Sequence, residues 1–361
     1  MAAIIVTGAL SIAAARYPMT SALQVVRYVE ILGVLILIVV TECTTERQIG
    51  AMVFSLLVGG LVASLIGIGQ FVYFAETTGL LHRVSGLHGG AYGGVVGSTF
   101  CLALGVLLHN PSRGKKIFAF IVLSCAMSAL ILSQTRAWIG GTICGVAAAL
   151  VLGRRLRVRW LIVLACTGAL AAFVVTQTDF LGFSTSGFLR GAVTRAFRYE
   201  APSNRMSVGD MALYERLIVW SRGASLAVQN PLFGIGAGNL RFDNYLTAHL
   251  SAPTKDAGFV DNQYLNFFAE AGIVAGAAWI FFLAVAFRVG LESFRGSHGT
   301  RVHGEAYGLF QSLFVFAVGT VFWVLTAHHD AFSMMILEIA LMYNIARLVR
   351  RSETAPAPVM Q

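Results

Sequence analysis

Residues 49–75 read IGAMVFSLLVGGLVASLIGIGQFVYFA, a run of 27 residues without a charged side chain. Roughly 20 such residues in a helix are enough to cross the hydrocarbon core of a bilayer. The whole chain has a matching composition: of its 361 residues 57% are apolar and 12% are charged, and its mean hydropathy is +0.75. A soluble domain has about 25% charged residues. The sequence therefore predicts a membrane protein.

Similar apolar runs recur along the chain and predict an all-α polytopic membrane protein with about ten transmembrane helices. The expected spans are residues 1–15, 25–40, 49–75, 88–109, 116–133, 137–152, 160–176, 264–287, 306–326 and 331–348. The first run lacks a basic segment and a small-residue cleavage site, which favours a helix over a cleaved signal peptide. Glycines four residues apart, at Gly141 and Gly145 and at Gly272 and Gly276, predict helices that pack closely.

One long polar segment, residues 177–262, interrupts this pattern. It divides the chain into residues 1–176 with seven expected helices, the loop 177–262, and residues 263–361 with three further helices and a cytoplasmic tail. Spanning a bilayer does not require such a segment, so we expect it to be a catalytic loop. Its residues 210–229 predict a short amphipathic helix, which Asn230-Pro231 should end. The GxGxG run that begins at Gly234 has no strand before it, so it predicts close backbone packing and not a dinucleotide site.

The net charge of +9 indicates a membrane topology and not a nucleic-acid partner. Basic residues cluster in alternate connections, at 113–116, 154–159, 288–301 and 347–351. Short loops rich in Lys and Arg stay in the cytoplasm, whereas long loops are exempt from this rule. The alternation predicts cytoplasmic termini and an extracytoplasmic loop 177–262. The sequence contains no CxxC motif and no Cys/His cluster that would predict a metal site.

Several polar side chains should gather on the outer side of the membrane under this topology. The arginines among them suit a diphosphate, because the guanidinium is planar, always charged and able to bind bidentately. A carboxylate at the start of a membrane helix can act as a base. The candidate catalytic residues are Arg136, Arg216 and Asp261, and the candidate substrate-binding residues are Arg83, Trp220, Asn262, Tyr264 and Glu270.

Each candidate also has an ordinary structural interpretation, and the residues alone leave both open. Arg136 is equally suited to lipid phosphates, and Arg216 to the solvated face of a loop helix. Asp261 is a suitable helix cap. Glu270 shares a helical face with Asn262 by four-residue steps, so hydrogen bonds within the helix bundle would also account for it.

Three motifs in this order resemble a known family. They are SQTRAW at 133–138, RLIVW at 216–220 continuing to NPLFGIGAGN at 230–239, and DNQYLNFFAEAG at 261–272. Together they resemble the O-antigen ligase-like superfamily of bacterial membrane glycosyltransferases, over about residues 80 to 290. The superfamily includes O-antigen ligases, O-antigen and exopolysaccharide polymerases, and protein O-oligosaccharyltransferases.

The resemblance implies a function in the bacterial inner membrane, with the large loop periplasmic. It implies transfer of a glycan from an undecaprenyl-diphosphate-linked donor to a glycan or lipid acceptor, without a cofactor or an essential metal. Arg136 and Arg216 match the arginines that hold the lipid diphosphate, and Arg83 matches a weaker element. Ligases of the family carry His-Asn where this chain has Asp261-Asn262, which favours a polysaccharide polymerase over a ligase.

Two other classes of protein remain open alternatives. A flippase for lipid-linked oligosaccharides, or another transporter, would place polar groups near the middle of the bilayer and often contains repeats. No long repeat is visible here, and the arginines gather outside the expected spans. A non-catalytic membrane scaffold is the other alternative.

Overall fold

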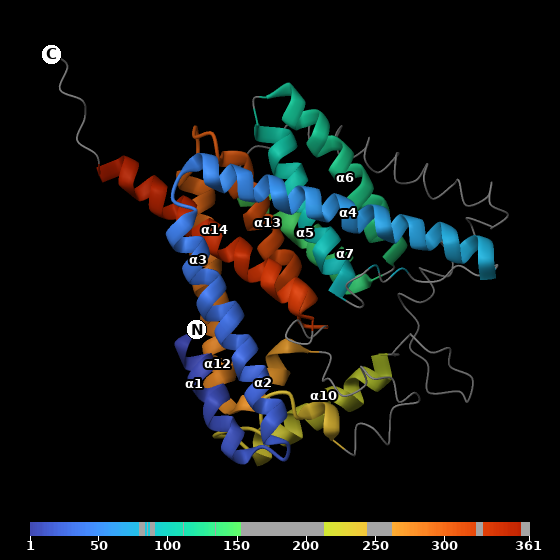
Figure 1. Ribbon diagram of the computed structural model, residues 1–361, viewed down its shortest axis with the longest axis vertical. Coiled ribbons are helices and arrows are strands. Elements are labelled where there is room, and N and C mark those ends of the chain that lie inside the picture. The colour runs from blue at the N-terminus through green and yellow to red at the C-terminus, as the bar shows by residue number, and fades with distance from the viewer. Residues whose placement is uncertain are drawn as a thin grey trace. The chain divides into compact units, whose positions relative to one another are not determined.

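The computed structural model describes residues 1–78, 84, 86, 91–110, 112–133, 135–152, 213–243, 262–322 and 328–354 (Figure 1). Within these residues all regular elements are helices. The helices long and apolar enough to cross a membrane are Pro18–Glu42, Glu46–Phe74, Tyr92–His109, Arg113–Ser133, Gln263–Gly296 and His329–Ser352. The chain is thus an all-helical, multi-pass membrane protein, as its composition predicts. The expected span 160–176 and most of the loop 177–262 lie outside the described residues.

The chain divides into two compact units, which are described one at a time. The first contains Met1–Leu35, Ser186–Ala284 and Gly319–Phe332. The second contains Ile36–Thr185, Val285–Val318 and Ser333–Gln361.

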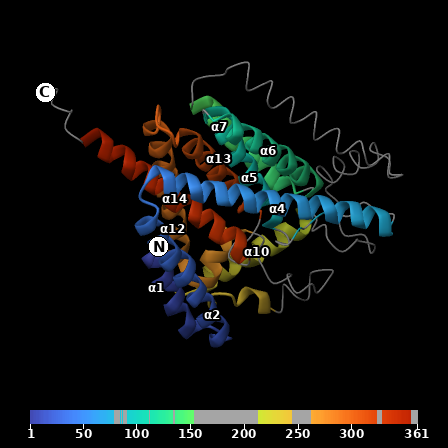
Figure 2. The same ribbon diagram turned by 45° about the horizontal axis from the view of Figure 1, so that its top comes forward.

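The second unit is a bundle of helices. It contains α3 (Ile36–Glu42), α4 (Glu46–Thr78), α5 (Tyr92–His109), α6 (Arg113–Ser133), α7 (Arg136–Leu152), most of α13 (His303–Gly319), and the later parts of α12 (Gln263–Gly296) and α14 (His329–Thr354). Helix α5 is buried along nearly its whole length and packs against α4, α6 and α7, which run beside it in both ribbon views (Figures 1 and 2).

Glycines make the close packing of this bundle possible. A Cβ atom on Gly105 would lie within 3.0 Å of the backbone of Gly304 and Gly308 on α13. A Cβ on Gly145 of α7 would lie equally close to the backbone oxygen of Gln311. The close packing predicted for Gly145 is confirmed, and the contact at Gly105 is of the same kind, with backbones that approach without intervening side chains.

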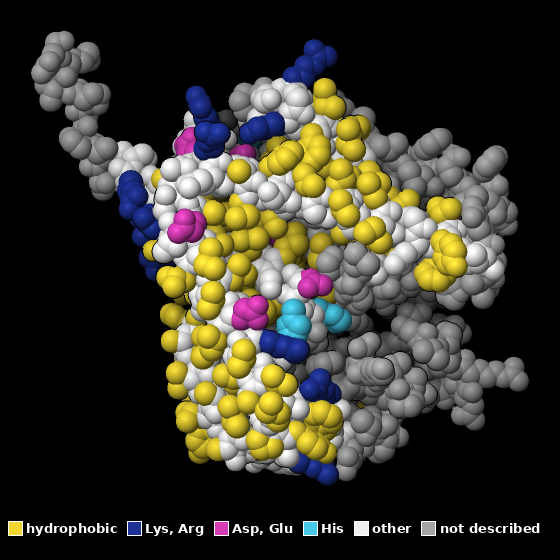
Figure 3. Space-filling model, in the orientation of Figure 1, with side chains coloured by type: hydrophobic (Ala, Val, Ile, Leu, Met, Phe, Trp, Pro, Cys, Tyr) yellow, Lys and Arg dark blue, Asp and Glu magenta, His cyan; other side chains and the backbone are white. Residues whose placement is uncertain are grey.

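The outer face of α4 carries large exposed apolar side chains. Phe54, Val58, Val62 and Leu65 lie on one side of the helix and are 39–52% exposed. Apolar side chains cover the surface along this helix in the space-filling view (Figure 3). A face of large apolar side chains at helical spacing is suited to lipid tails and not to water.

The first unit combines elements from distant parts of the sequence. It contains α1 (Ala2–Ser11), a 3-10 turn at Ile12–Ala14, α2 (Pro18–Tyr28), a π-helical stretch at Val29–Leu35, α10 (Leu213–Gln229), a 3-10 turn at Leu240–Phe242, and the first part of α12. The expected loop helix 210–229 is α10, and it ends immediately before Asn230-Pro231 as predicted. Helix α12 begins at Gln263 as expected, but it does not continue smoothly through Gly272.

Candidate functional site: a loop docked in a broken membrane helix

Helix α12 is interrupted at Gly272, whose φ of 83° and ψ of −178° are not helical. In a continuous helix the carbonyl of residue 269 would accept a hydrogen bond from the amide of residue 273. Here the Ala269 carbonyl accepts from Ile235 N at 2.9 Å, and the Ile273 amide donates to Pro231 O at 2.8 Å. The segment 230–239 therefore supplies the backbone partners that the break removes. Such replacement is what makes a broken helix tolerable in a membrane protein.

The glycines of this segment explain how it fits so closely. Gly234, Gly236 and Gly238 all have positive φ, at 64°, 100° and 74°, a region that residues with a Cβ rarely adopt. A Cβ on Gly234 would lie within 3.0 Å of the backbone of Glu270. The amide of Gly236 donates to Glu270 O at 3.0 Å. Close backbone packing, predicted for the GxGxG run, is confirmed, and its partner is the broken helix.

The side chain of Glu270 holds the same segment from the other side. Glu270 is 3% exposed, and its Oε1 accepts a hydrogen bond from Leu240 N at 3.2 Å. The amide of Gly238 also bonds to this carboxyl group. Its Oε2 accepts from Asn266 Nδ2 at 3.0 Å, so the expected polar face of α12 exists. Buried carboxyl groups are tolerated only when hydrogen-bonded, and these contacts satisfy that condition.

A second set of contacts ties the segment to the N-terminal helices. Asn239 accepts from Tyr17 N at 2.9 Å and donates to Ser21 Oγ at 2.7 Å. The Ser21 hydroxyl donates to Ala237 O at 2.9 Å, and Ser11 Oγ accepts from Ala237 N at 3.1 Å. These contacts join residues more than 200 positions apart, so the local sequence does not indicate that residues 1–28 belong to the site.

The start of α12 and the middle of α10 both contact residues 320–322, the short segment that follows α13. The amide of Gln263 donates to Thr320 O at 2.9 Å, and Tyr264 forms a hydrogen bond with the side chain of Thr320. The rings of Trp220 and Phe322 lie 5.8 Å apart between centroids. The structure therefore places two predicted substrate-binding residues, Trp220 and Tyr264, against the same short segment, residues 320–322.

Asn262 has a clear local role. Its Oδ1 accepts a hydrogen bond from Leu265 N at 3.0 Å, the geometry of an N-cap, and the residue is buried. The sequence suggested a cap at the preceding residue, Asp261, which lies outside the described residues, as does Arg83.

The two candidate arginines are described only by their places in the helices. Arg136 is the first residue of α7, three residues after α6 ends at Ser133. Arg216 lies in the first turn of α10, one helical turn before Trp220. Among the described residues, no group of three His, Cys, Asp or Glu side chains is placed to hold a metal ion.

These observations define a multi-pass membrane protein in which a glycine-rich loop segment docks into a broken helix. Residues 118–280, from α6 to a point just beyond the break in α12, match the model of a family described as O-antigen ligase. The matched region contains Arg136, Arg216, the docked segment and Glu270. It confirms the resemblance to the O-antigen ligase-like superfamily and supports a membrane glycosyltransferase of the ligase or polymerase type. No curated protein sequence matches the chain significantly.

Proposed function

We propose that this protein is a polysaccharide polymerase of the bacterial inner membrane. It transfers a glycan from an undecaprenyl-diphosphate-linked donor to an acceptor hydroxyl at the periplasmic face, where residues 177–262 lie. The observation that carries the proposal is the match over residues 118–280, which includes both candidate arginines and the docked segment. The contacts at Thr320 and Phe322 support it, because they join the helix that carries Arg216 to the helix that Asp261 precedes.

The proposed reaction is a direct displacement at the anomeric carbon of the donor sugar. Asp261 removes the proton of the acceptor hydroxyl, whose oxygen then forms the new glycosidic bond. The bond between the sugar and the diphosphate breaks, and the diphosphate leaves with the electron pair. Arg136, Arg216 and Arg83 neutralise the charge that grows on this leaving group. A diphosphate neutralised in this way needs no general acid and no metal.

The other proposed residues position the reactants. Trp220 and Tyr264 offer ring surfaces for a sugar, and Asn262 fixes the start of α12 directly after Asp261. Glu270 is fully engaged with the amides of the docked segment and with Asn266. We therefore propose that Glu270 acts on the substrate through the segment that it holds.

Analysis of lipid-linked glycans in cells that lack the protein tests the proposal. A polymerase predicts that single repeat units accumulate on the lipid carrier. Full-length polymer on its carrier would instead indicate an O-antigen ligase, and an unglycosylated protein acceptor would indicate a protein O-oligosaccharyltransferase. Donor trapped in the cytoplasmic leaflet would indicate a flippase and would refute the proposed transfer.

Variants of α10 provide a matched test of the diphosphate contact. Arg216→Ala should abolish most transfer, and so should Arg136→Ala, while Arg216→Lys should rescue poorly because one point charge replaces a bidentate fork. Arg222→Ala is the control on the same helix, because Arg222 is engaged with Asp243 through a bidentate pair at 3.2 and 2.8 Å. Full activity of Arg216→Ala at normal expression would remove that residue from the site.

A further inference from the structure

Two charged side chains lie deep within the first long candidate membrane span. The span runs from Pro18 to Glu42, and Glu30 is its middle residue, about 18 Å from either end at the helical rise of about 1.5 Å per residue. Arg27 lies one turn before Glu30, and both residues are exposed. A charge at this depth is costly, so charged residues inside membrane spans commonly mark the path of a substrate or an ion.

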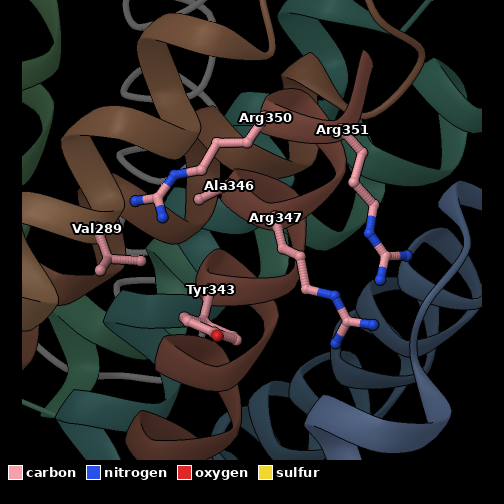
Figure 4. Close-up of a pocket in the computed structure, with 6 residues that line it drawn as sticks. All are labelled: Val289, Tyr343, Ala346, Arg347, Arg350 and Arg351. Carbon is pink, nitrogen blue, oxygen red and sulfur yellow. The ribbon is translucent and has the colours of Figure 1, made fainter. Parts of the chain in front are cut away.

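The last turns of α14 show the more usual placement of charges, at the end of a span. Figure 4 shows three arginines there, Arg347, Arg350 and Arg351. Arg350 is paired with Glu292, with Nη2 to Oε2 at 2.6 Å. Arg27 and Glu30 differ in both respects, because they lie in mid-span and their side chains form no hydrogen bond or ion pair with any residue that the structure describes.

The start of α14 adds further polar groups to these two. The imidazole of His329 interacts electrostatically with Arg27, with Glu30 and with its own neighbour Asp330. All four residues belong to the first unit. Figure 3 shows histidine side chains beside acidic and basic ones within a largely apolar face. The structure thus places a cluster of polar groups, called the mid-span cluster below, on a surface that is otherwise suited to lipid.

The backbone beside the mid-span cluster is unusual as well. A π-helical stretch covers Val29–Leu35, so it begins directly before Glu30. Such turns are rare and occur frequently at functional sites. The neighbouring Tyr28 is buried, and its ring centroid lies 5.9 Å from that of Phe267 on α12. Phe267 follows Tyr264 by one helical turn, so the mid-span cluster lies beside the part of α12 that carries a proposed substrate-binding residue.

The mixture of charges in the mid-span cluster suits hydroxyl groups and not a phosphate. The carboxylates of Glu30 and Asp330 balance Arg27 and a protonated imidazole, so no excess of positive charge attracts an anion. A hydroxyl group donates and accepts, so it can bond to a carboxylate and to a guanidinium together. Val26 and Val29 are 61% and 42% exposed beside these charges and offer an apolar surface to a hydrocarbon chain.

We propose that Arg27, Glu30 and His329 bind the hydroxyl groups of a lipid-linked glycan that approaches α12 from the bilayer. The Glu30 carboxylate accepts hydrogen bonds from the sugar, and the Arg27 guanidinium donates to it. The lipid chain lies over the exposed valines of α2. This inference rests on the proposed function, which supplies the lipid-linked glycan. It adds a recognition site for the sugar on the lipid side, apart from the arginines proposed to hold the diphosphate.

Native mass spectrometry of the full-length protein in neutral detergent tests the inference with two probes. The first is the lipid-linked glycan extracted from cells that lack the protein, and the second is undecaprenyl diphosphate without a glycan. Glu30→Gln should weaken retention of the first probe by about 10- to 100-fold, because a hydrogen bond to a charged group is lost. It should leave retention of the second probe unchanged, and Arg27→Gln should show the same selectivity.

The matched controls are Glu42→Gln and Arg47→Gln, which make the same chemical changes at exposed positions near the end of the span and just beyond it. Both controls should retain the two probes as the parent protein does. Unchanged retention of the glycan probe by Glu30→Gln and Arg27→Gln, or equal loss of both probes, would overturn the inference and leave the proposed function intact. Retention of neither probe by the parent protein would overturn both.

Thermal unfolding in mixed micelles distinguishes a binding role of Glu30 from a structural one. Glu30→Leu replaces an unpaired charge in the span with an apolar side chain, so the variant should unfold at a temperature no lower than that of the parent protein. Its retention of the glycan probe should still fall as in Glu30→Gln. A lower unfolding temperature would show that Glu30 stabilises the fold, and would overturn its assignment to a glycan site.

Discussion

Two of the buried glutamates, Glu270 in the first unit and Glu338 in the second, differ in what surrounds them. Glu270 is 3% exposed, and its partners are the backbone amides of Gly238 and Leu240 and the side-chain amide of Asn266. Glu338 in the second unit is 1% exposed, and it accepts hydrogen bonds from the hydroxyls of Ser98 and Ser312. The oxygens of these two hydroxyls lie 2.8 Å apart, so Ser312 can donate to Ser98 when the carboxyl is absent.

The chemistry of the partners explains what this difference means. A backbone amide can only donate, whereas a hydroxyl can donate or accept and can rotate to another partner. The contacts of Glu270 thus fix a loop segment to a broken helix. If the carboxyl group is lost, the amides that donate to it have no other acceptor. The contacts of Glu338 join three helices that already pack through glycine and small side chains. We infer that polar contacts determine the structure of the first unit, called the first region below. Close packing of complementary surfaces determines the structure of the second unit, the second region.

The sharpest test of this division concerns Asp261, the residue of the first region that comes directly before Asn262 and α12. Asp261→Asn keeps the size of the side chain and removes its charge. Loss of a base should lower the transfer rate by roughly 10²- to 10⁴-fold. A structural role alone should leave the rate near normal, because Asn262 supplies the cap of α12. Transfer measured with lipid-linked donor, beside thermal unfolding, separates the two roles. Asp243→Asn makes the same chemical change in the ion pair with Arg222, and it should leave the rate near normal.

Much of the second region could be predicted from the sequence, because it depends on local pattern. The runs 116–133 and 137–152 correspond to helices Arg113–Ser133 and Arg136–Leu152. The predicted run 25–40, most of which belongs to the first region, is too short, since the helical stretch begins at Pro18, the first residue of α2. Proline is favoured at that position, but polar residues such as Gln24 and Arg27 lower the local hydrophobicity and conceal the helix start.

The first region could be predicted only in part, because its main contacts join distant residues. The shared face of Asn266 and Glu270 follows from their spacing, and the structure confirms it. The break at Gly272 does not follow from local sequence, since Gly272 and Gly276 have the spacing of an ordinary packing stripe. The break is stable only because residues 231 and 235, about 40 positions earlier, supply backbone partners. The roles of Asp261, Arg136 and Arg216 stay predictions.

Gly272→Ala tests whether the break itself is required. The φ and ψ of Gly272 lie in a region that is essentially restricted to glycine, and a Cβ there would lie within 3.0 Å of Leu232 O. Strain and overpacking together should cost about 3 kcal/mol of unfolding free energy. Denaturant titration in mixed micelles measures this loss. A variant as stable as the parent protein would mean that α12 can run continuously and that the docked segment is dispensable.

Replacement of each buried glutamate by methionine tests the opening comparison directly. Glu270→Met leaves the amides of Leu240 and Asn266 buried without an acceptor, and it should cost about 2 kcal/mol. Glu338→Met leaves Ser98 and Ser312 bonded to each other, so the change should stay within about 1 kcal/mol. The same titration applied to both variants gives the difference. Equal losses would show that the two carboxyl groups have the same structural importance.

The smallest effect is expected from two adjacent glycines of α4, and it tests whether shape alone specifies the second region. A Cβ on Gly60 would lie within 3.0 Å of the Thr99 side chain on α5, whereas a Cβ on Gly59 would meet no atom within 4 Å. Gly60→Ala should therefore cost about 1 kcal/mol or more through overpacking. Gly59→Ala should stabilise the protein by about 0.5–1 kcal/mol, because alanine loses less backbone entropy in a helix. Both substitutions make the same change in helix propensity. If the two changes in unfolding free energy have opposite signs, the difference must therefore come from the contact with Thr99. If both variants changed the unfolding free energy in the same direction, α4 and α5 would pack less closely than the contact between Gly60 and Thr99 implies. Polar contacts would then determine the structure of the second region as well.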